Sequence, residues 1–189
     1  MSADEVRHTE QLLSDGSRIR HDETEHFYRD NLGRMRTESA TGALIYDPVT
    51  RCTYDLTTNR KTYIRIPNSE DSVVTIAAAA SRSSTTTSTG HGKPESATVT
   101  EELASQLVNG VSARGARLTT TIHAGTLGND HDLKVVNERW YSDDLKLLVK
   151  SSNSDPRFGL ATYELTNISQ AEPDPALFQI PAGYTEGHR

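Results

Sequence analysis

Three of the seven histidines, His8, His21 and His26, lie in neighbouring segments that alternate apolar and polar residues as strands do. Imidazole is a common ligand of zinc and related metals, so a metal site is one hypothesis for this group. Across a turn at Asp15 and Gly16, however, each histidine is expected to face a glutamate and not another histidine. We therefore interpret the group as His–Glu pairs on a solvated sheet face, and we predict no metal and no cofactor.

His123 and His131 bracket a loop that contains two glycines and several acidic residues. A loop histidine beside Asp132 could act as a general base, since imidazole titrates near neutrality. No nucleophile accompanies them at a suitable spacing, and the chain has no Gly-X-Ser-X-Gly elbow, phosphate loop or dinucleotide fingerprint. A hydrolase that uses His123, His131 and Asp132 is therefore our third-ranked function, and we predict that the protein is not an enzyme.

Cys52 is the single cysteine, so neither an intrachain disulfide nor a zinc site of the paired-cysteine type is possible. The neighbouring cation, Arg51, could activate the thiol, but successive residues of a strand point to opposite faces. We predict that Cys52 is a small, packed strand residue without catalytic function.

The composition limits the partners and the compartment. The chain has 189 residues, of which 34% are hydrophobic, and a net charge of −6. This length favours one domain, 1–189. The acidic balance argues against nucleic acid, which binds to a positive field. No apolar run approaches the roughly 20 residues of a membrane span, and residues 1–6 do not have the pattern of a signal peptide.

The first third of the chain has short alternating runs separated by turn residues, which predicts an antiparallel meander. Asp15 and Gly16 are typical of a two-residue type I′ turn. Such a turn places Leu12 opposite Ile19, Glu10 opposite His21 and His8 opposite Glu23. A second turn at 31–33 places Asp30 opposite Arg34, Tyr28 near Arg36 and His26 near Glu38. Three further strands are expected over 43–46, 51–55 and 60–66.

Residues 67–97 interrupt this pattern with an alanine run and a low-complexity serine and threonine stretch. Such side chains bury too little surface to offset the entropy of ordering, which predicts a long mobile loop. A short helix over 71–80 is an alternative within it.

The sheet is expected to resume after this loop. Asn109 and Gly110 predict a hairpin between 105–108 and 111–122, and Asp143 and Asp144 predict another between 133–141 and 145–152. A last strand is expected over 160–168, followed by one helical turn that Asp174 caps. The prediction is a mainly β fold, with a single curved antiparallel sheet of about nine to eleven strands and little helix.

Such a sheet has two faces, and 34% hydrophobic residues cannot cover both. We expect one apolar, concave face that could line a site for an acyl chain or another lipophilic ligand, or that simply packs as core. The candidate lining residues are Trp140, Val136, Leu118, Ile122, Leu145, Leu147, Val149, Ile64 and Ile66.

The stretch from Asn137 to Thr185, NERWYSDDLKLLVKSSNSDPRFGLATYELTNISQAEPDPALFQIPAGYT, and the N-terminal FYRDNLGRMRTES and LIYDPVTRCTYDL resemble a group of uncharacterised, exported bacterial proteins of the acidobacterial type. Their layout is similar to that of the LolA/LolB-like lipoprotein-carrier superfamily, including the RseB-type regulator domain. The shared pattern is a tryptophan-bearing strand and a closing segment. These positions are Trp140, Pro173, Asp174, Leu177, Phe178, Pro181, Gly183 and Tyr184.

The resemblance implies a half-barrel sheet and a periplasmic or secreted location. It also implies a non-catalytic cell-envelope binding protein for a lipophilic ligand or a lipidated partner, so the expected partner is a lipid or an acylated protein. The alternative function is a protein-interaction or sensor module that docks another envelope protein through a sheet edge or the 67–97 loop. A fold can be shared without its function, so the two functions need separate tests.

Overall fold

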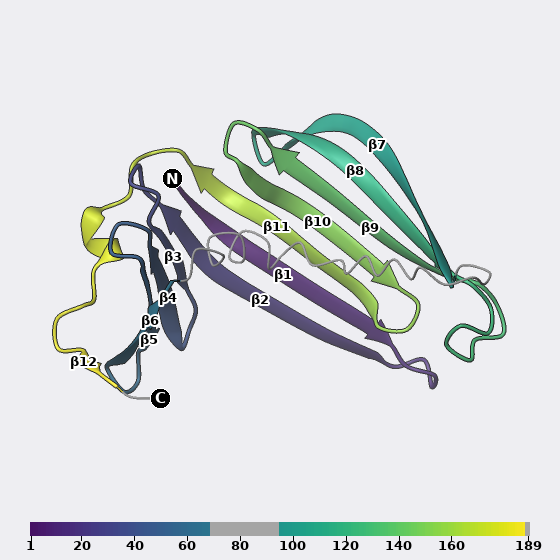
Figure 1. The fold of residues 1–189 in the computed structure, drawn as a ribbon, viewed down its shortest axis with the longest axis horizontal. Helices are drawn as coiled ribbons and strands as arrows, with labels where there is room; N and C mark the ends of the chain where they lie inside the picture. Colours follow the sequence, from purple (N-terminus) through teal and green to yellow (C-terminus); the bar gives the residue numbers. More distant parts are fainter. Residues whose placement is uncertain (69–94, 188–189) are drawn as a thin grey trace. The chain divides into compact units, whose positions relative to one another are not determined.

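The structure is a computed structural model that describes residues 1–68 and 95–187. Within this part of the chain, twelve strands form one open sheet in the order β12-β6-β5-β4-β3-β2-β1-β11-β10-β9-β8-β7, with little helix (Figure 1). The strands are β1 (Ser2–Leu12), β2 (Arg18–Arg29), β3 (Met35–Glu38), β4 (Gly42–Asp47), β5 (Cys52–Thr57), β6 (Thr62–Pro67), β7 (Ser96–Val108), β8 (Val111–Ile122), β9 (Leu133–Ser142), β10 (Leu147–Asp155), β11 (Gly159–Ser169) and β12 (Thr185–Glu186).

The mainly β, single-sheet prediction is confirmed, with three differences. The sheet has one more strand than expected, and β12 pairs with β6 in parallel, so the sheet is mixed. The expected loop over 67–97 is shorter at both ends, because Pro67 ends β6 and β7 begins at Ser96. The rest of that loop, and the short helix expected over 71–80, lie outside the described residues.

The described residues form two compact units. Unit 1 comprises 1–6, 23–68 and 165–187, and unit 2 comprises 7–22 and 95–164. The single-domain organisation expected from the length stays a prediction.

Unit 1 is built on β3 to β6, which pair in sequence as antiparallel neighbours. Its core consists of Ala43, Ile45 and Leu56, against which Tyr54, Tyr63 and Tyr184 pack. The predicted pairing across the second turn is confirmed, since His26 is opposite Glu38, Tyr28 is opposite Arg36 and Asp30 binds Arg34.

The C-terminal segment folds against unit 1 through polar contacts. Arg36 Nη1 donates to the carbonyl oxygen of Leu177 at 2.9 Å, and the Arg34 guanidinium lies 4.9 Å from the ring centre of the buried Phe178. Leu177 and Phe178 belong to a 3₁₀ helix, η3 (Pro175–Phe178), whose N-cap is Asp174, as predicted. Here the Asp174 carboxylate accepts from the backbone N–H of Ala176 at 2.9 Å.

Unit 2 contains the hairpins of β7 to β11. Asn109 and Gly110 both have positive φ, +48° and +84°, as the predicted type I′ turn requires. The turn between β9 and β10 is longer than expected: Ser142 pairs with Leu147, so Leu145 lies in the turn and not on a strand. A bulge follows between Leu148 and Lys150.

The β1–β2 turn differs from the prediction by one residue. The N–H of Leu13 bonds to the carbonyl of Ser17, and Gly16 has φ +85° whereas Asp15 is not in the positive region. This is a three-residue loop of the type that ends in a glycine bulge, not a type I′ turn. A shift of one residue exchanges the faces of a strand. Glu10 therefore bonds to Arg18 and Arg20, instead of facing His21.

Candidate functional site

The strand register gives the sheet of unit 2 two chemically different faces. One row across β8, β9 and β10 consists of Gly115, Trp140 and Lys150, whose side chains point to the same face. The next row consists of Ala116, Arg139 and Ser151, whose side chains point to the opposite face. Tyr163 on β11 continues the row of Ser151. We call the side of Trp140 the ion-pair face and the side of Tyr163 the tyrosine face.

The ion-pair face carries charges that neutralise one another. Arg117 lies between Glu138, at 2.6 Å, and Glu101, at 3.6 Å. The hydrogen bond to Glu138 also raises the pKa of the Arg117 guanidinium. Lys150 pairs with Glu164 at 3.3 Å. Alternating, half-exposed pairs of this kind are typical of a solvated sheet face.

Trp140 lies on this ion-pair face and not on an apolar lining. Its indole covers Gly115, where an added Cβ would lie 2.7 Å from Trp140 Nε1. The Lys150 ammonium lies 5.9 Å from the ring centre. Val136 and Leu147 point to the same side, in register with Thr119 and Ser142. The expectation that these residues share an inner face with Leu118 is therefore wrong.

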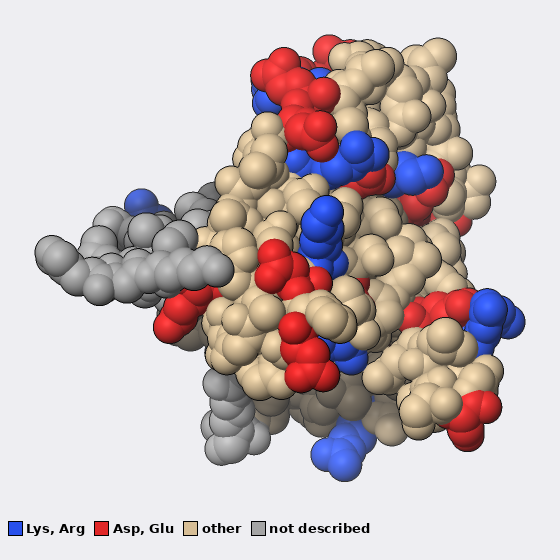
Figure 2. All heavy atoms as spheres, turned by 90° about the vertical axis from the view of Figure 1, so that its right-hand side faces the viewer, with Lys and Arg blue, Asp and Glu red and all other residues tan. Residues whose placement is uncertain are grey.

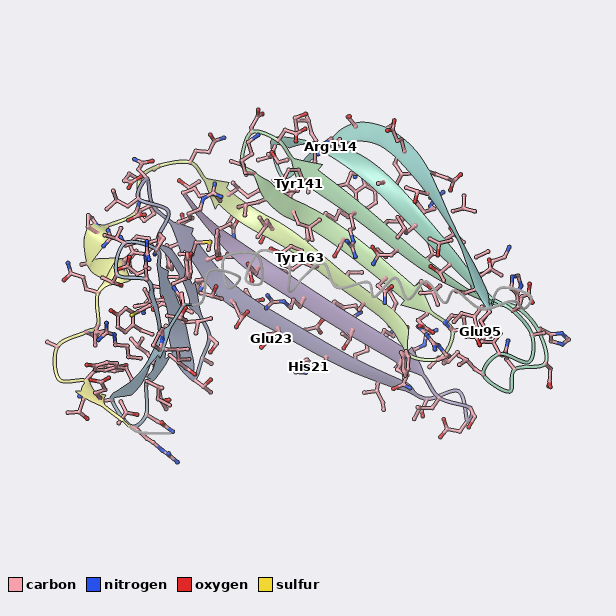
Figure 3. The ribbon with its side chains drawn as sticks, viewed as in Figure 1. His21, Glu23, Glu95, Arg114, Tyr141 and Tyr163 are labelled. Atoms are coloured by element: carbon pink, nitrogen blue, oxygen red, sulfur yellow. The ribbon has the colours of Figure 1, made fainter. Side chains whose placement is uncertain are left out.

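The tyrosine face carries three arginines, two of them stacked on tyrosine rings. The Arg114 guanidinium lies 5.5 Å from the ring centre of Tyr141, and the Arg7 guanidinium lies 5.7 Å from that of Tyr163. Arg139 Nε donates to Asn137 Oδ1 at 2.6 Å, and burial lowers the pKa of the Arg139 guanidinium. Figure 3 labels Arg114, Tyr141 and Tyr163, which follow one another across β8, β9 and β11.

Aliphatic side chains continue the tyrosine face beyond these rows. Register pairs Leu118 with Asn137, Ile122 with Leu133 and Val135 with Thr120, and Leu148 lies beside Tyr141. All five aliphatic side chains are half-buried. Guanidinium groups with an aromatic neighbour bind anionic groups, and a row of aliphatic side chains binds hydrocarbon. The tyrosine face therefore has the chemistry to hold an amphiphile.

The expected lining residues that belong to unit 2 do not share one face of its sheet. Leu118 and Ile122 lie on the tyrosine face, and Trp140, Val136 and Leu147 lie on the ion-pair face. Leu145 is buried in the β9–β10 turn, and Val149 is buried at the β10 bulge. Ile64 and Ile66 are on β6, in unit 1. This corrects their assignment to one face, and their contact with a ligand stays a prediction.

Sequence reasoning missed the arginines and tyrosines of the tyrosine face. The available signal was their period of two within each predicted strand, as in Arg139 and Tyr141. That signal becomes a shared face only when the register between strands is known.

The His123 loop is organised as a structural turn. His123 Nδ1 lies 3.3 Å from Asp132 Oδ2, and Asp132 Oδ1 accepts from the N–H of Ala124 at 2.9 Å. His131 does not join them: its carbonyl accepts from Asn129 Nδ2 at 2.7 Å, and its side chain is exposed. Within residues 1–68 and 95–187, no group of three His, Cys, Asp or Glu side chains could hold a metal ion. That the protein is not an enzyme stays a prediction.

Cys52 is buried, and Arg65 Nε donates to its sulfur at 3.1 Å. The prediction of a packed strand residue is therefore confirmed.

Among the residues that the structure describes, no helix is long and apolar enough to cross a membrane. Figure 2 shows basic and acidic side chains lying beside one another, as the many ion pairs require.

No protein-family model matches the chain, and no curated protein matches its sequence. Solved structures similar to it include MucB in complex with MucA(peri), with a TM-score of 0.42 and 15% identity over 96% of this chain and 55% of that one. The Pseudomonas aeruginosa MucA/MucB complex has a TM-score of 0.43 and 12% identity over 95% and 56%. The chain thus spans about half the length of these two chains.

A LolA superfamily protein from Nitrosomonas europaea is also similar, with a TM-score of 0.34 and 10% identity over 94% of this chain and 89% of that one. The closer resemblance to acidobacterial exported proteins stays a prediction.

Proposed function

We propose that the protein is a non-catalytic binding protein of the bacterial cell envelope whose tyrosine face holds an amphiphile, a lipid or the acyl group of a lipidated partner. The observation that supports this proposal most is the juxtaposition of Arg114, Arg139 and Arg7 with half-buried aliphatic residues on one sheet face. The envelope location rests on the sequence resemblance.

The ligand orientation follows from the two kinds of side chain on this face. The arginine rows lie toward one end of β8 and β9, and the aliphatic residues Ile122 and Leu133 lie at the other end. An anionic head group fits the guanidinium groups, and a hydrocarbon chain fits the strand rows beyond them. Glu102 on β7 lies beside Ala116 in register, and Asp143 pairs with Arg114 at 2.9 Å. These two carboxylates disfavour an anion beside β7 and β8 and favour one over β9 to β11.

The test is native mass spectrometry of the purified protein, followed by organic extraction of any bound lipid. Leu118→Ser and Val136→Ser form a matched pair, since both residues are half-buried and aliphatic but lie on opposite faces. We expect a stoichiometric lipid on the wild type and on Val136→Ser, and its loss from Leu118→Ser with folding retained. Equal loss from both variants would contradict the assignment of the tyrosine face.

A second function, docking of an envelope protein, is favoured by a separate observation. β7 is the last strand in the sheet order of the described residues, it is thirteen residues long, and nearly all of it is exposed. An edge strand of this kind can pair with an extended segment of a partner. Two results together would favour this function over lipid binding. Native mass spectrometry would show the protein without a bound lipid, and the protein would capture an envelope protein in a pull-down that the Thr98→Pro variant on β7 fails to reproduce.

A further inference from the structure

Exposed apolar side chains gather at one end of unit 2. The described part of the chain has ten large apolar side chains that are exposed, and six of them lie on or beside the turns at this end. They are Leu12, Leu13, Ile19, Leu127, Phe158 and Leu160. Exposed apolar groups that cluster in this way mark an interaction surface. We call residues 12–19, 123–132 and 155–160 the turn end.

The strand order brings these three turns to the same end. β8 ends at Ile122, opposite the start of β9, and β10 ends opposite the start of β11. The β1–β2 turn is adjacent to the β10–β11 turn, because Glu10, Leu12, Pro156 and Leu160 line one pocket of about 280 Å³. Figure 1 shows the loops after β1, β8 and β10 on this side of unit 2.

The arginines of the turn end are paired with carboxylates, so the turn end presents no cationic field. Arg157 Nη2 lies 2.6 Å from Asp155 Oδ2, and Arg18 Nη1 lies 2.8 Å from Glu10 Oε1. Arg157 also stacks on Phe158, with 5.0 Å from its guanidinium to the ring centre. An arginine whose stem and guanidinium cover an exposed aromatic ring suits a water–lipid boundary.

We propose that the turn end docks on the surface of a neutral phospholipid bilayer, inserting Leu12, Ile19, Leu127 and Phe158. The apolar groups stand on separate turns with polar residues between them, an arrangement that fits a fluid surface better than one rigid partner. Paired charges and the acidic residues Asp15 and Asp130 give no attraction for anionic lipid. The insertion is therefore driven by apolar burial and is insensitive to salt.

The test is co-sedimentation of the full chain with phosphatidylcholine vesicles, with and without phosphatidylglycerol. The double variant Leu12→Ser/Phe158→Ser removes two side chains that are 63% and 69% exposed. The matched control is Leu32→Ser/Leu107→Ser, whose side chains are 63% and 75% exposed and belong to none of the three turns that define the turn end. Because all four residues are exposed, both variants should fold as the wild type does.

We expect the wild type and the control to bind phosphatidylcholine vesicles equally, and the turn-end variant to bind about tenfold or more weakly. Added salt should not change this binding. Failure of the wild type to bind, equal binding by both variants, or binding only to vesicles with phosphatidylglycerol would overturn the proposal. Self-association that the turn-end variant abolishes, without vesicle binding, would also overturn it. Leu118→Ser should leave vesicle binding unchanged, because Leu118 lies outside the turn end. Failure of the membrane-docking proposal can therefore be distinguished from failure of the proposed amphiphile site on the tyrosine face.

Discussion

Leu118 on β8 and Trp140 on β9 point to opposite faces of the same stretch of sheet, because Leu118 is in register with Asn137 and Trp140 is in register with Gly115. The protein has one tryptophan. Its fluorescence therefore reports on the ion-pair face and not on the tyrosine face.

This relationship predicts a null result in a ligand titration. A lipid bound on the tyrosine face should leave the emission maximum of Trp140 unchanged, because the sheet separates the indole from the ligand. The measurement is a fluorescence titration of the wild type with the extracted lipid, with binding followed independently by native mass spectrometry. A blue shift that saturates with the bound fraction would place the ligand on the side of Trp140.

Gly115 is a position where a side chain should be costly. An alanine Cβ there would lie 2.7 Å from Trp140 Nε1 and 2.9 Å from Leu103 Cβ, so the neighbours must move. We expect Gly115→Ala to lower the free energy of unfolding by about 1–3 kcal/mol, as overpacking does. Urea denaturation measures this loss. Gly187→Ala is the control, since its added Cβ would meet nothing closer than 3.8 Å.

The Asp30 carboxylate organises the second turn of unit 1. Its oxygens accept from the N–H of Leu32 at 3.0 Å, the N–H of Arg34 at 2.9 Å and Arg34 Nε at 2.6 Å, and its side chain is 3% exposed. Asp30→Ala leaves a half-buried arginine and two N–H groups without this acceptor. We expect a loss of about 3 kcal/mol in the free energy of unfolding.

Asp143→Ala is the matched control for Asp30, because it removes an ion pair, with Arg114, whose members are both mostly exposed. Exposed pairs contribute about 0–1 kcal/mol. Equal losses from Asp30→Ala and Asp143→Ala in the same chemical denaturation experiment would contradict the assigned role of Asp30.

Asp155 should make the stability of unit 2 depend on acid pH. Hydrogen bonds from the Arg157 side chain lower the pKa of the Asp155 carboxyl, against the opposing effect of burial. A carboxyl with a lowered folded-state pKa adds stability above its unfolded pKa of about 3.9, and this stability is lost as pH falls through the folded value.

The difference in unfolding free energy between the wild type and Asp155→Asn should therefore be constant near neutrality and shrink below about pH 4. Urea denaturation at several pH values measures it. Arg157→Ala should make this decline smaller, since it removes the side-chain bonds that lower the pKa of Asp155 and leaves only the backbone N–H of residue 157 to oppose burial. An unchanged profile in Arg157→Ala would contradict the assigned cause.

Local sequence signals predicted much of the fold. The turn at Asn109 and Gly110 was predictable because these two residue types adopt positive φ readily, and the structure has this turn. The cap at Asp174 was predictable because its carboxylate bonds to the backbone and Pro175 favours the first helical position, and the structure has this cap. Strand existence also followed from the period of two, because that period reflects which side chains leave water.

Register was the part that local signals could not supply everywhere. Gly16 adopts positive φ alone, and the resulting three-residue loop shifts every pairing of β1 with the first half of β2 by one residue. The shared face expected for Leu118 and Trp140 was wrong for the same reason: each residue lies on a correctly predicted strand, but the face that it occupies is decided by the register between strands.

The order of segments in unit 1 has a consequence for synthesis on the ribosome. Unit 2 has all of its described strand segments once Glu164 has been made, whereas unit 1 lacks η3 and β12 until residues 175–186 emerge. During that interval β6 has no β12 beside it, and Arg36 has no Leu177 carbonyl to bind. Every described segment of unit 2 has therefore been synthesised while unit 1 is still incomplete, so unit 1 is the unit that completes its fold last.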